Sequence, residues 1–475
     1  MRVENNVFPP EVQEAVLFPF DDSSIPLTYG LQLGLVQGRR QGILVRPGKP
    51  GMPDCRRVRY YGTVIRNGEE FRMWYLGLGD QDDKYRVCYA ISQDGIKWEK
   101  PTLGLVEYGG STQNNLVDLL NGEYSVVEAP IIYDSEDPDP ARRFKMAFES
   151  EKYQNRLAVA FSPDGLHWKE SSCNPVTKHM LEQSGVIKFN ECYYVNGQLG
   201  GPRPGALRQM VTYMSYDFEH WTEATALSFR RDVEPPPEGS WNAGEQVHLG
   251  ASLWNRGNVI IGFYGMWHGH ESDDRRLVTM DLGLVVSNDA IHFKEPVPGF
   301  KIIPCYEEPE TASGIHGLLG AALAQGQGFE NVGEQTLYWY EVWNQGQVRL
   351  ATWPRDRFGY YKVYREGRRQ MLEEPHFISC PIRLNDSGGR VFVNADGLSI
   401  NSYLRVEIYD EKFRRLPGYS ADDCVPLMEP GPRQPVVWRN KETLDKFDHP
   451  IRIRVNYGGL RPEDIHVYAI YVSSS

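Results

Sequence analysis

The amino-acid sequence predicts an all-β protein, a five-bladed β-propeller followed by a C-terminal β-sandwich. Three observations predict it: a turn motif that recurs along most of the chain, strand-like runs between its copies, and a final region that has strands but lacks the motif. Long helical periodicity is hard to find. We therefore expect an N-terminal arm packed on the propeller (1–45), the propeller itself (46–370) and the sandwich (376–475).

The recurring turn, which we call the clasp, is clearest in Ser92-Gln-Asp-Gly-Ile-Lys-Trp98 and Ser162-Pro-Asp-Gly-Leu-His-Trp168. Looser copies begin at Ser215, Ser287 and Thr352, so that copies stand 53 to 72 residues apart. Asp-Gly favours a tight turn with Gly at positive φ, and the Trp is large enough to pack between neighbouring sheets. The spacing suits one four-stranded sheet per copy, and five such sheets around an axis form a propeller.

Strand-like runs rich in β-branched and aromatic residues fill each interval, among them "RYYGTVI", "FRMWYLG", "RRFKMAFE", "NVIIGFYGM" and "TLYWYEVW". The segment "DPDPARR", residues 137–143, reads as a charged turn between two of them. From residue 376 the short strands "GGRVFVNADGL", "SYLRVEIYDE" and "PIRIRVNYGGL" alternate without a clasp, which predicts the sandwich.

Composition narrows the class of partner. The net charge is −12 and Lys/Arg-rich runs are absent, so nucleic acid is not an expected partner. No apolar stretch is long enough for a membrane helix, and the N-terminus lacks the apolar core of a secretory signal, so a cytoplasmic location is favoured for the chain as given. The seven Cys form no CxxC and suggest neither a zinc site nor a disulfide framework. No cofactor is predicted; a structural cation on the propeller axis and a homo-oligomer are left open.

Four acidic side chains and one histidine lie just ahead of the first strands of the five predicted blades. The residues at this position are Asp54, Glu128, Glu182, Glu245 and His316. If the blades are alike, these side chains ring one mouth of the central channel. Glu128 and Glu245 lie among apolar residues, where a carboxylate is costly unless it is paired or functional.

A ring of carboxylates in a pocket suggests the hydrolysis of glycosides. The reaction needs one protonated acid for the leaving oxygen and one carboxylate that attacks the sugar or activates water. Crowded carboxylates raise one another's pKa, which supplies the proton donor. The sequence therefore predicts a glycosidase that acts on a carbohydrate substrate.

Aromatic and histidine side chains near these acids are candidates for substrate contacts. Trp241 and His248 flank Glu245, while Trp267 and His268 belong to "MWHGHESDDRR", residues 266–276. Trp267 would stack on a sugar face and His268 would bond hydroxyl groups. Core packing is an equally good interpretation of Trp241 and His248, and a solvated loop is favoured over a metal site for residues 266–276.

Several of these stretches resemble a known family. "FRMWYLG", "YAISQDGIKWEKPTLGLVEYGGSTQNN", "DPDPARRFKMAF" and "VNADG" resemble bacterial proteins of the family-32-like glycosidases, and the propeller resembles that of glycoside hydrolase family 43 as well. The resemblance covers about residues 60–470. It implies a propeller with a C-terminal sandwich and exo action on a glycoside or an oligosaccharide end.

The resemblance also implies roles for single residues. The Glu-Ala-Pro at 128–130 is similar to the family's motif around the catalytic acid, and Asp54 would correspond to its nucleophile or base. The chain departs from the family in three ways: Glu128 falls on the second predicted blade instead of the third, Asp54 lacks the Asn-Asp-Pro-Asn context, and the Arg-Asp-Pro motif is absent. A different sugar, or a different acid pair such as Glu128 with Glu245, therefore stays open. Glu182 and His316 are expected to support the pair.

Two other classes stay open. A carbohydrate-binding propeller without catalysis would have pocket aromatics but no carboxylate pair. A sialidase-like enzyme would need a trio of arginines for the substrate carboxylate and a Tyr nucleophile, and the trio is not identifiable from the sequence.

Overall fold

The computed structural model describes residues 1–199, 208–222, 226–231, 239–305, 318–343, 345–364 and 372–474. Within these ranges the secondary structure is β-strand with five short 3-10 helices, and the prediction of an all-β fold is confirmed. The 3-10 turns are η1 (Leu120–Gly122), η2 (Pro140–Arg142), η3 (Glu151–Tyr153), η4 (Arg275–Leu277) and η6 (Pro462–Asp464). No helix in the described ranges is long and apolar enough to cross a membrane.

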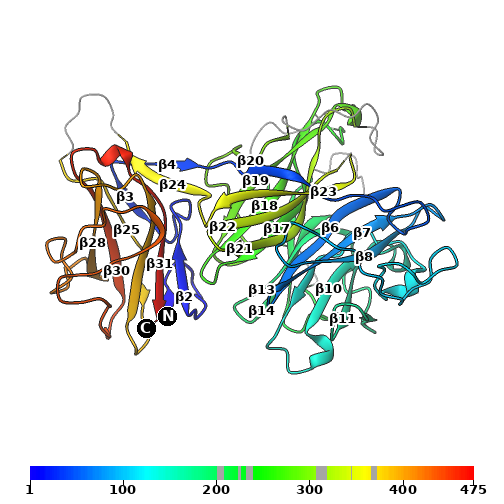
Figure 1. Ribbon diagram of the computed structural model, residues 1–475, viewed down its shortest axis with the longest axis horizontal. Helices are drawn as coiled ribbons and strands as arrows, with labels where there is room; N and C mark the ends of the chain where they lie inside the picture. Colours follow the sequence, from blue (N-terminus) through cyan, green and yellow to red (C-terminus); the bar gives the residue numbers. More distant parts are fainter. Residues whose placement is uncertain are drawn as a thin grey trace.

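Three four-stranded antiparallel sheets follow one another along the chain (Figure 1). The first contains β9 (Ile131–Tyr133), β10 (Phe144–Glu149), β11 (Leu157–Ser162) and β12 (Lys169–Glu170). The second contains β13 (Leu181–Phe189), β14 (Cys192–Leu199), β15 (Met210–Ser215) and β16 (Ala226–Phe229). The third contains β17 (Gly244–Asn255), β18 (Ile260–Gly269), β19 (Thr279–Ser287) and β20 (Lys301–Ile303).

A seven-stranded sheet contains two further strand groups. Its order is β5-β23-β22-β21-β6-β7-β8, and a single parallel bridge between Gln327 and Thr63 joins β21 to β6. The strands are β5 (Arg39–Val45), β6 (Arg57–Asn67), β7 (Glu70–Leu78), β8 (Tyr85–Ser92), β21 (Leu323–Val332), β22 (Gln335–Val342) and β23 (Gln347–Pro354). The first strands of the five groups contact one another in the order β6, β9, β13, β17, β21 and back to β6. The first strands therefore form a closed cycle, and the count of five blades stays a prediction.

Two six-stranded sheets form the C-terminal module, at the left of Figure 1. One contains β1 (Arg2–Val3), β3 (Leu27–Tyr29), β25 (His376–Ile378), β26 (Ile382–Arg383), β28 (Tyr403–Asp410) and β30 (Ile451–Gly458). The other contains β2 (Glu14–Leu17), β4 (Leu31–Leu35), β24 (Gly359–Val363), β27 (Gly389–Asp396), β29 (Gly431–Pro435) and β31 (His466–Ser474). One buried apolar cluster takes side chains from both sheets.

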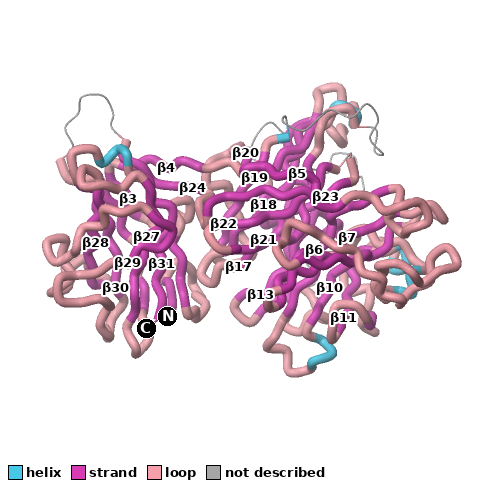
Figure 2. The backbone as a smooth tube through the Cα atoms, viewed as in Figure 1, coloured by secondary structure: helices cyan, strands magenta, loops and turns pink. Residues whose placement is uncertain are grey.

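The N-terminal segment predicted as an arm contributes strands to both parts of the molecule. Four of its strands, β1 to β4, pair within the C-terminal module, and β5 adds the outer strand to the β21–β23 group. The two chain ends lie side by side at this module, since β2 pairs with β31 (Figure 2). The divisions at residues 45, 370 and 376 stay predictions.

The four clasps that begin at Ser92, Ser162, Ser215 and Ser287 have the turn geometry that their sequence predicts. The copy at Thr352 does not, because the Arg355 N–H donates to the Glu334 carbonyl instead. In the second clasp, Ser162 Oγ accepts the Gly165 N–H at 2.8 Å, and Asp164 Oδ1 accepts the N–H groups of residues 166 and 167. The Gly165 carbonyl accepts the indole N–H of Trp168 and also that of Trp74, on β7 of the preceding group, at 2.7 Å. This clasp therefore ties its sheet to the preceding strand group, and the Gly95 carbonyl of the first clasp likewise accepts the indole N–H of Trp339.

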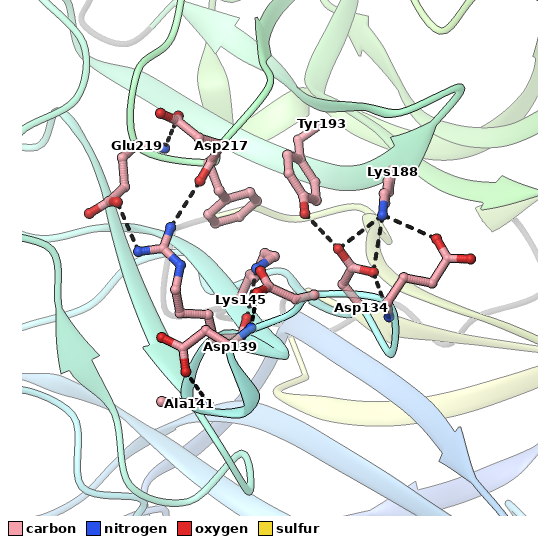
Figure 3. Close-up of polar contacts among 12 residues, drawn as sticks. Asp134, Asp139, Ala141, Lys145, Lys188, Tyr193, Asp217 and Glu219 are labelled. Atoms are coloured by element: carbon pink, nitrogen blue, oxygen red, sulfur yellow. Dashed lines mark hydrogen bonds and ion pairs between the residues drawn. The ribbon is translucent and has the colours of Figure 1, made fainter.

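Charged side chains join the β9–β12 and β13–β16 sheets at their outer ends. Figure 3 shows Tyr193 and Lys188 directed at Asp134. The Tyr193 hydroxyl lies 2.5 Å from the Asp134 carboxylate. Arg142, in the predicted charged turn, pairs with Glu219 at 2.8 Å. The "DPDPARR" turn is thus a structural contact between two sheets.

Candidate active site

A cavity of about 140 Å³ lies where the five strand groups meet. Its charged lining residues are Arg59, Glu128, Glu182, Arg208 and Arg275. Its aromatic lining residues are Tyr61, His248, Trp267 and Trp343, and Val127, Gln198 and Leu249 complete the wall. Each strand group supplies at least one of these side chains, so residues far apart in the sequence meet at the hub.

Bulges in the first strands direct these side chains into the cavity. The pairing register shifts within β6, β13, β17 and β21. In β17 the shift between His248 and Ala251 includes Leu249 and Gly250 at positive φ, 61° and 102°. A Cβ on Gly250 would lie 2.3 Å from Asn196 Oδ1, so this position requires glycine. A bulge re-aims the residues beside it, and here it places His248 and Leu249 in the cavity wall.

Glu128 is the most deeply buried acid of the cavity, at 1 % exposure. Its carboxyl group is hydrogen-bonded to that of Glu149, which is itself 4 % exposed. Burial first, and then the like charge of Glu149, raise the pKa of Glu128 well above its usual range. Burial also raises the pKa of Glu149 to about 7. The two carboxyl groups therefore share a proton near neutral pH.

Glu182 has a different environment in the same cavity. Burial raises its pKa, but a hydrogen bond from the Gln198 amide and the nearby charges of the cavity arginines oppose this rise. Glu128 has the carboxyl group of Glu149 beside it, whereas Glu182 has the positive charges of the arginines near it. Glu182 is therefore the more easily ionised of the two acids that line the cavity.

Stacking on aromatic rings positions the arginines. The Arg59 guanidinium lies 4.0 Å from the ring centre of Tyr61, and that of Arg208 lies 4.1 Å from Trp267. Arg275, in η4, lies 5.9 Å from Trp267 and 5.8 Å from Trp343. Such stacking leaves the N–H edges of a guanidinium available to a ligand.

Asp54 does not line this cavity, and its predicted place in the ring is corrected. It is fully buried beside β7, where it accepts a hydrogen bond from the Tyr75 hydroxyl at 2.8 Å and pairs with Lys100 at 2.5 Å. Its distance from the clasp predicts a position at the start of the first blade. Asp54 precedes β6, however, and the cavity residues of that group, Arg59 and Tyr61, lie inside the strand.

Glu245 also lies outside the cavity lining, in a chain of ion pairs. His268 Nδ1 lies 2.7 Å from Glu245, and its Nε2 lies 2.7 Å from Asp281. Arg231 pairs with Glu245, and Lys301 pairs with Asp281 at 2.6 Å. Burial alone would raise the pKa of Glu245, but His268 and Arg231 together lower it. A carboxylate held ionised in this way is not a proton donor.

The remaining predicted residues divide between the cavity and its surroundings. His248 and Trp267 line the cavity, and Trp267 is almost fully buried. Trp241 does not line it, but its carbonyl accepts a hydrogen bond from Arg208 at 2.6 Å. His316 lies outside the described residues.

The sequence interpretation missed the arginines and Glu149. Arg59 belongs to "RVRYYG", which was recognised only as a strand, and Arg275 belongs to the "MWHGHESDDRR" loop. Glu149 ends a buried strand in "KMAFES", where an acid among apolar residues was a usable signal. Within the described ranges, no group of three or more His, Cys, Asp or Glu side chains is placed to hold a metal ion.

No family model matches the chain. Two curated relatives from Mycobacterium tuberculosis are similar to part of it: uncharacterized protein Rv1502 is 30 % identical and uncharacterized protein MT1551 is 29 % identical, each over 115 residues. The matched part is 23 % of this chain and spans a third (33 %) of the relatives' length.

Three solved structures of glycoside-active enzymes are also similar to the chain. The first represents GH130 mannoside phosphorylases, a family that contains glycoside hydrolases targeting β-1,2 mannosidic linkages in Candida mannan (14 % identity, 68 % of this chain and 95 % of that chain, TM-score 0.43). The second is an exo-β-1,3-galactanase from Phanerochaete chrysosporium (10 % identity, 91 % of this chain and 100 % of that chain, TM-score 0.37). The third is the Bombyx mori GH32 β-fructofuranosidase BmSUC1 (10 % identity, 92 % of this chain and 94 % of that chain, TM-score 0.37).

Proposed function

We propose that the protein is a glycoside hydrolase whose reaction takes place in the hub cavity. One observation carries the proposal: two acids, Glu128 and Glu182, line one small cavity, where Glu128 faces a second carboxyl group and Glu182 faces the Gln198 amide and the charges of the cavity arginines. Glycoside hydrolysis needs such a pair, one carboxylic acid and one carboxylate. A non-catalytic sugar-binding site would have no use for a carboxyl pair that shares a buried proton.

In this proposal Glu128 donates the proton to the leaving oxygen. Burial and the neighbouring Glu149 raise the pKa of Glu128 and so favour its protonated form, as a general acid requires. Glu149 is not in the cavity lining and acts through Glu128, so it is a positioning residue. Glu182 acts as the carboxylate that attacks the sugar or activates water. Gln198 and His248 line the same cavity and offer groups for the hydroxyls of the sugar.

The size of the cavity supports action on one terminal sugar. At about 140 Å³ it is smaller than the roughly 300–1,000 Å³ of sites for drug-sized ligands. A single glycosyl unit is the appropriate occupant, so exo action is part of the proposal. Assignment to family 32 or 43 stays a prediction.

A panel of aryl pyranosides and furanosides tests the proposal, with good and poor leaving groups for each sugar. We expect Glu128→Gln to lose about 10²–10⁴-fold in kcat on poor leaving groups and far less on dinitrophenyl glycosides, which need no proton. Glu182→Gln should lose activity on both. Glu149→Gln should retain activity and move the alkaline limb of the pH–rate profile to lower pH, because it removes the like charge that raises the pKa of Glu128.

Exposed Glu107 provides the matched control, Glu107→Gln, which should leave every measurement unchanged. The proposal fails if the parent cleaves no glycoside in the panel. It also fails if Glu128→Gln and Glu182→Gln both keep full activity while the parent is active.

A further inference from the structure

The cavity arginines carry more positive charge than the acids beside them can balance. Arg59 lies 4.0 Å from Glu341, which is also 3.8 Å from Arg57, so one carboxylate serves two guanidinium groups. Within the described parts of the chain, no carboxylate lies within 4 Å of Arg208 or Arg275. Arg208 instead donates to neutral oxygens, the Trp241 carbonyl at 2.6 Å and the Gln246 side chain at 3.2 Å.

The acids of the cavity do not compensate for this excess. Glu128 and Glu149 share a proton and together contribute about one negative charge. Among the described lining residues, Glu182 is the acid whose charge interacts with Arg59, Arg208 and Arg275 together. Burial lowers the pKa of Arg208 to about 10, so its guanidinium stays charged at neutral pH despite the cost. A buried cation without a carboxylate partner is expensive unless a ligand pairs with it.

The geometry of the arginines suits an oxyanion. Arg208 and Arg275 both lie against Trp267, from different segments of the chain, with Arg208 donating to Trp241 through one nitrogen only. The remaining N–H groups of a planar guanidinium can donate in pairs to a carboxylate, sulfate or phosphate. Arg208 and Arg275 line the same cavity as Glu128, so such a group would sit beside the reacting sugar.

We propose that Arg208 and Arg275 bind an oxyanion in the hub cavity, so that the preferred ligand is an acidic sugar or a neutral sugar together with an inorganic oxyanion. The inference rests on the proposed function for the position of the sugar, but binding of the anion does not require catalysis. It extends the predicted site from neutral hydroxyl recognition to recognition of charge.

Calorimetric binding to the intact protein tests this inference without turnover. The Glu128→Gln variant is titrated with methyl β-glucuronide, methyl β-glucoside, N-acetylneuraminic acid and inorganic phosphate, in buffer free of other oxyanions. We expect at least one anion to bind ten-fold or more tighter than the neutral glucoside. Arg275→Gln, at an exposed position, should weaken that binding about 10- to 100-fold, and Arg208→Lys should weaken it by removing the fork while keeping the charge.

The neighbouring Arg276 provides a matched control. It is exposed, pairs with Asp274 at 2.6 Å and does not line the cavity, so Arg276→Gln should not change anion affinity. Tighter binding of an acidic sugar than of phosphate identifies a substrate-borne anion. Binding of phosphate that strengthens glucoside binding identifies a separate oxyanion. The inference is overturned if all four ligands bind equally, or if Arg275→Gln and Arg276→Gln behave alike. Anion binding by a protein that cleaves no glycoside would overturn only the proposed function.

Discussion

Replacing Glu149 by Gln should change how the stability of the protein depends on pH. Glu149 is 4 % exposed, and burial raises its pKa from 4.5 to about 7. The folded protein therefore binds this proton more tightly than the unfolded chain does. The resulting stability is fully present below about pH 4.5 and is lost as the pH rises through about 7.

The size of the effect follows from the two pKa values. At 1.36 kcal/mol per pKa unit, the change from 4.5 to about 7 corresponds to about 3 kcal/mol, of which about 2–3 kcal/mol falls between pH 5 and pH 8. Glu149→Gln removes this ionisation, keeps the shape of the side chain and can donate a hydrogen bond to Glu128. Between pH 5 and pH 8, the free energy of unfolding of the variant should therefore fall by about 2–3 kcal/mol less than that of the parent.

Urea unfolding at pH 5 and pH 8, followed by Trp fluorescence, measures the difference. The parent and Glu149→Gln are compared at both pH values, so that other titrating groups cancel. Glu107→Gln, an exposed change of the same kind, should follow the parent. Equal losses of stability in the parent and Glu149→Gln, with equal slopes against urea, would refute the buried proton shared with Glu128.

Three further changes test the clasp, the Asp54 ion pair and the ion-pair chain around His268. Asp164→Ala should lower the free energy of unfolding by about 1–2 kcal/mol, because two backbone N–H groups lose their acceptor; a change below 0.5 kcal/mol in urea unfolding would contradict this. Lys100→Met should lower the free energy of unfolding by about 3 kcal/mol in the same assay, because it leaves the buried Asp54 without its cation. Asp54→Asn should be less stable than the parent but retain its kcat. Loss of kcat in a folded Asp54→Asn protein would show that Asp54 belongs to the active site. Burial lowers the pKa of His268, but Asp281 and Glu245 outweigh burial and raise it. The imidazole ring should therefore titrate above 6.5 when followed by NMR. Its stabilising effect should be present below about pH 6.5 and lost above the raised pKa, so His268→Gln should cost more at pH 6 than at pH 9.

The fold was largely predictable because its signal is local and repeated. The four clasps that begin with Ser satisfy their own hydrogen bonds within six residues, so their sequence specifies their shape without knowledge of the neighbouring sheet. Even Phe218 and Ala290 take the positive φ of the clasp glycine, at 69° and 65°, which shows that the turn tolerates other residues there. The partners of the N-terminal strands were not predictable, because pairing across more than 300 residues leaves no periodic trace.

The site was predictable only in part, for a different physical reason. Glu128 and Glu182 could be found as acids at the start of buried strands. Asp54 has the same local pattern, and only its contact with Lys100 distinguishes an internal ion pair from a cavity acid. Arg208 and Arg275 enter the cavity from loops, where arginine is common and its direction is set by distant rings such as Trp267.

The pairing of β2 with β31 has a consequence for synthesis on the ribosome. Residues 14–17 leave the exit tunnel more than 400 residues before their partner strand, residues 466–474. Throughout that interval this early strand exposes an unpaired backbone edge, which favours aggregation. Expression should therefore respond to chaperone supply and to small truncations at the carboxyl end, more than to substitutions in the hub.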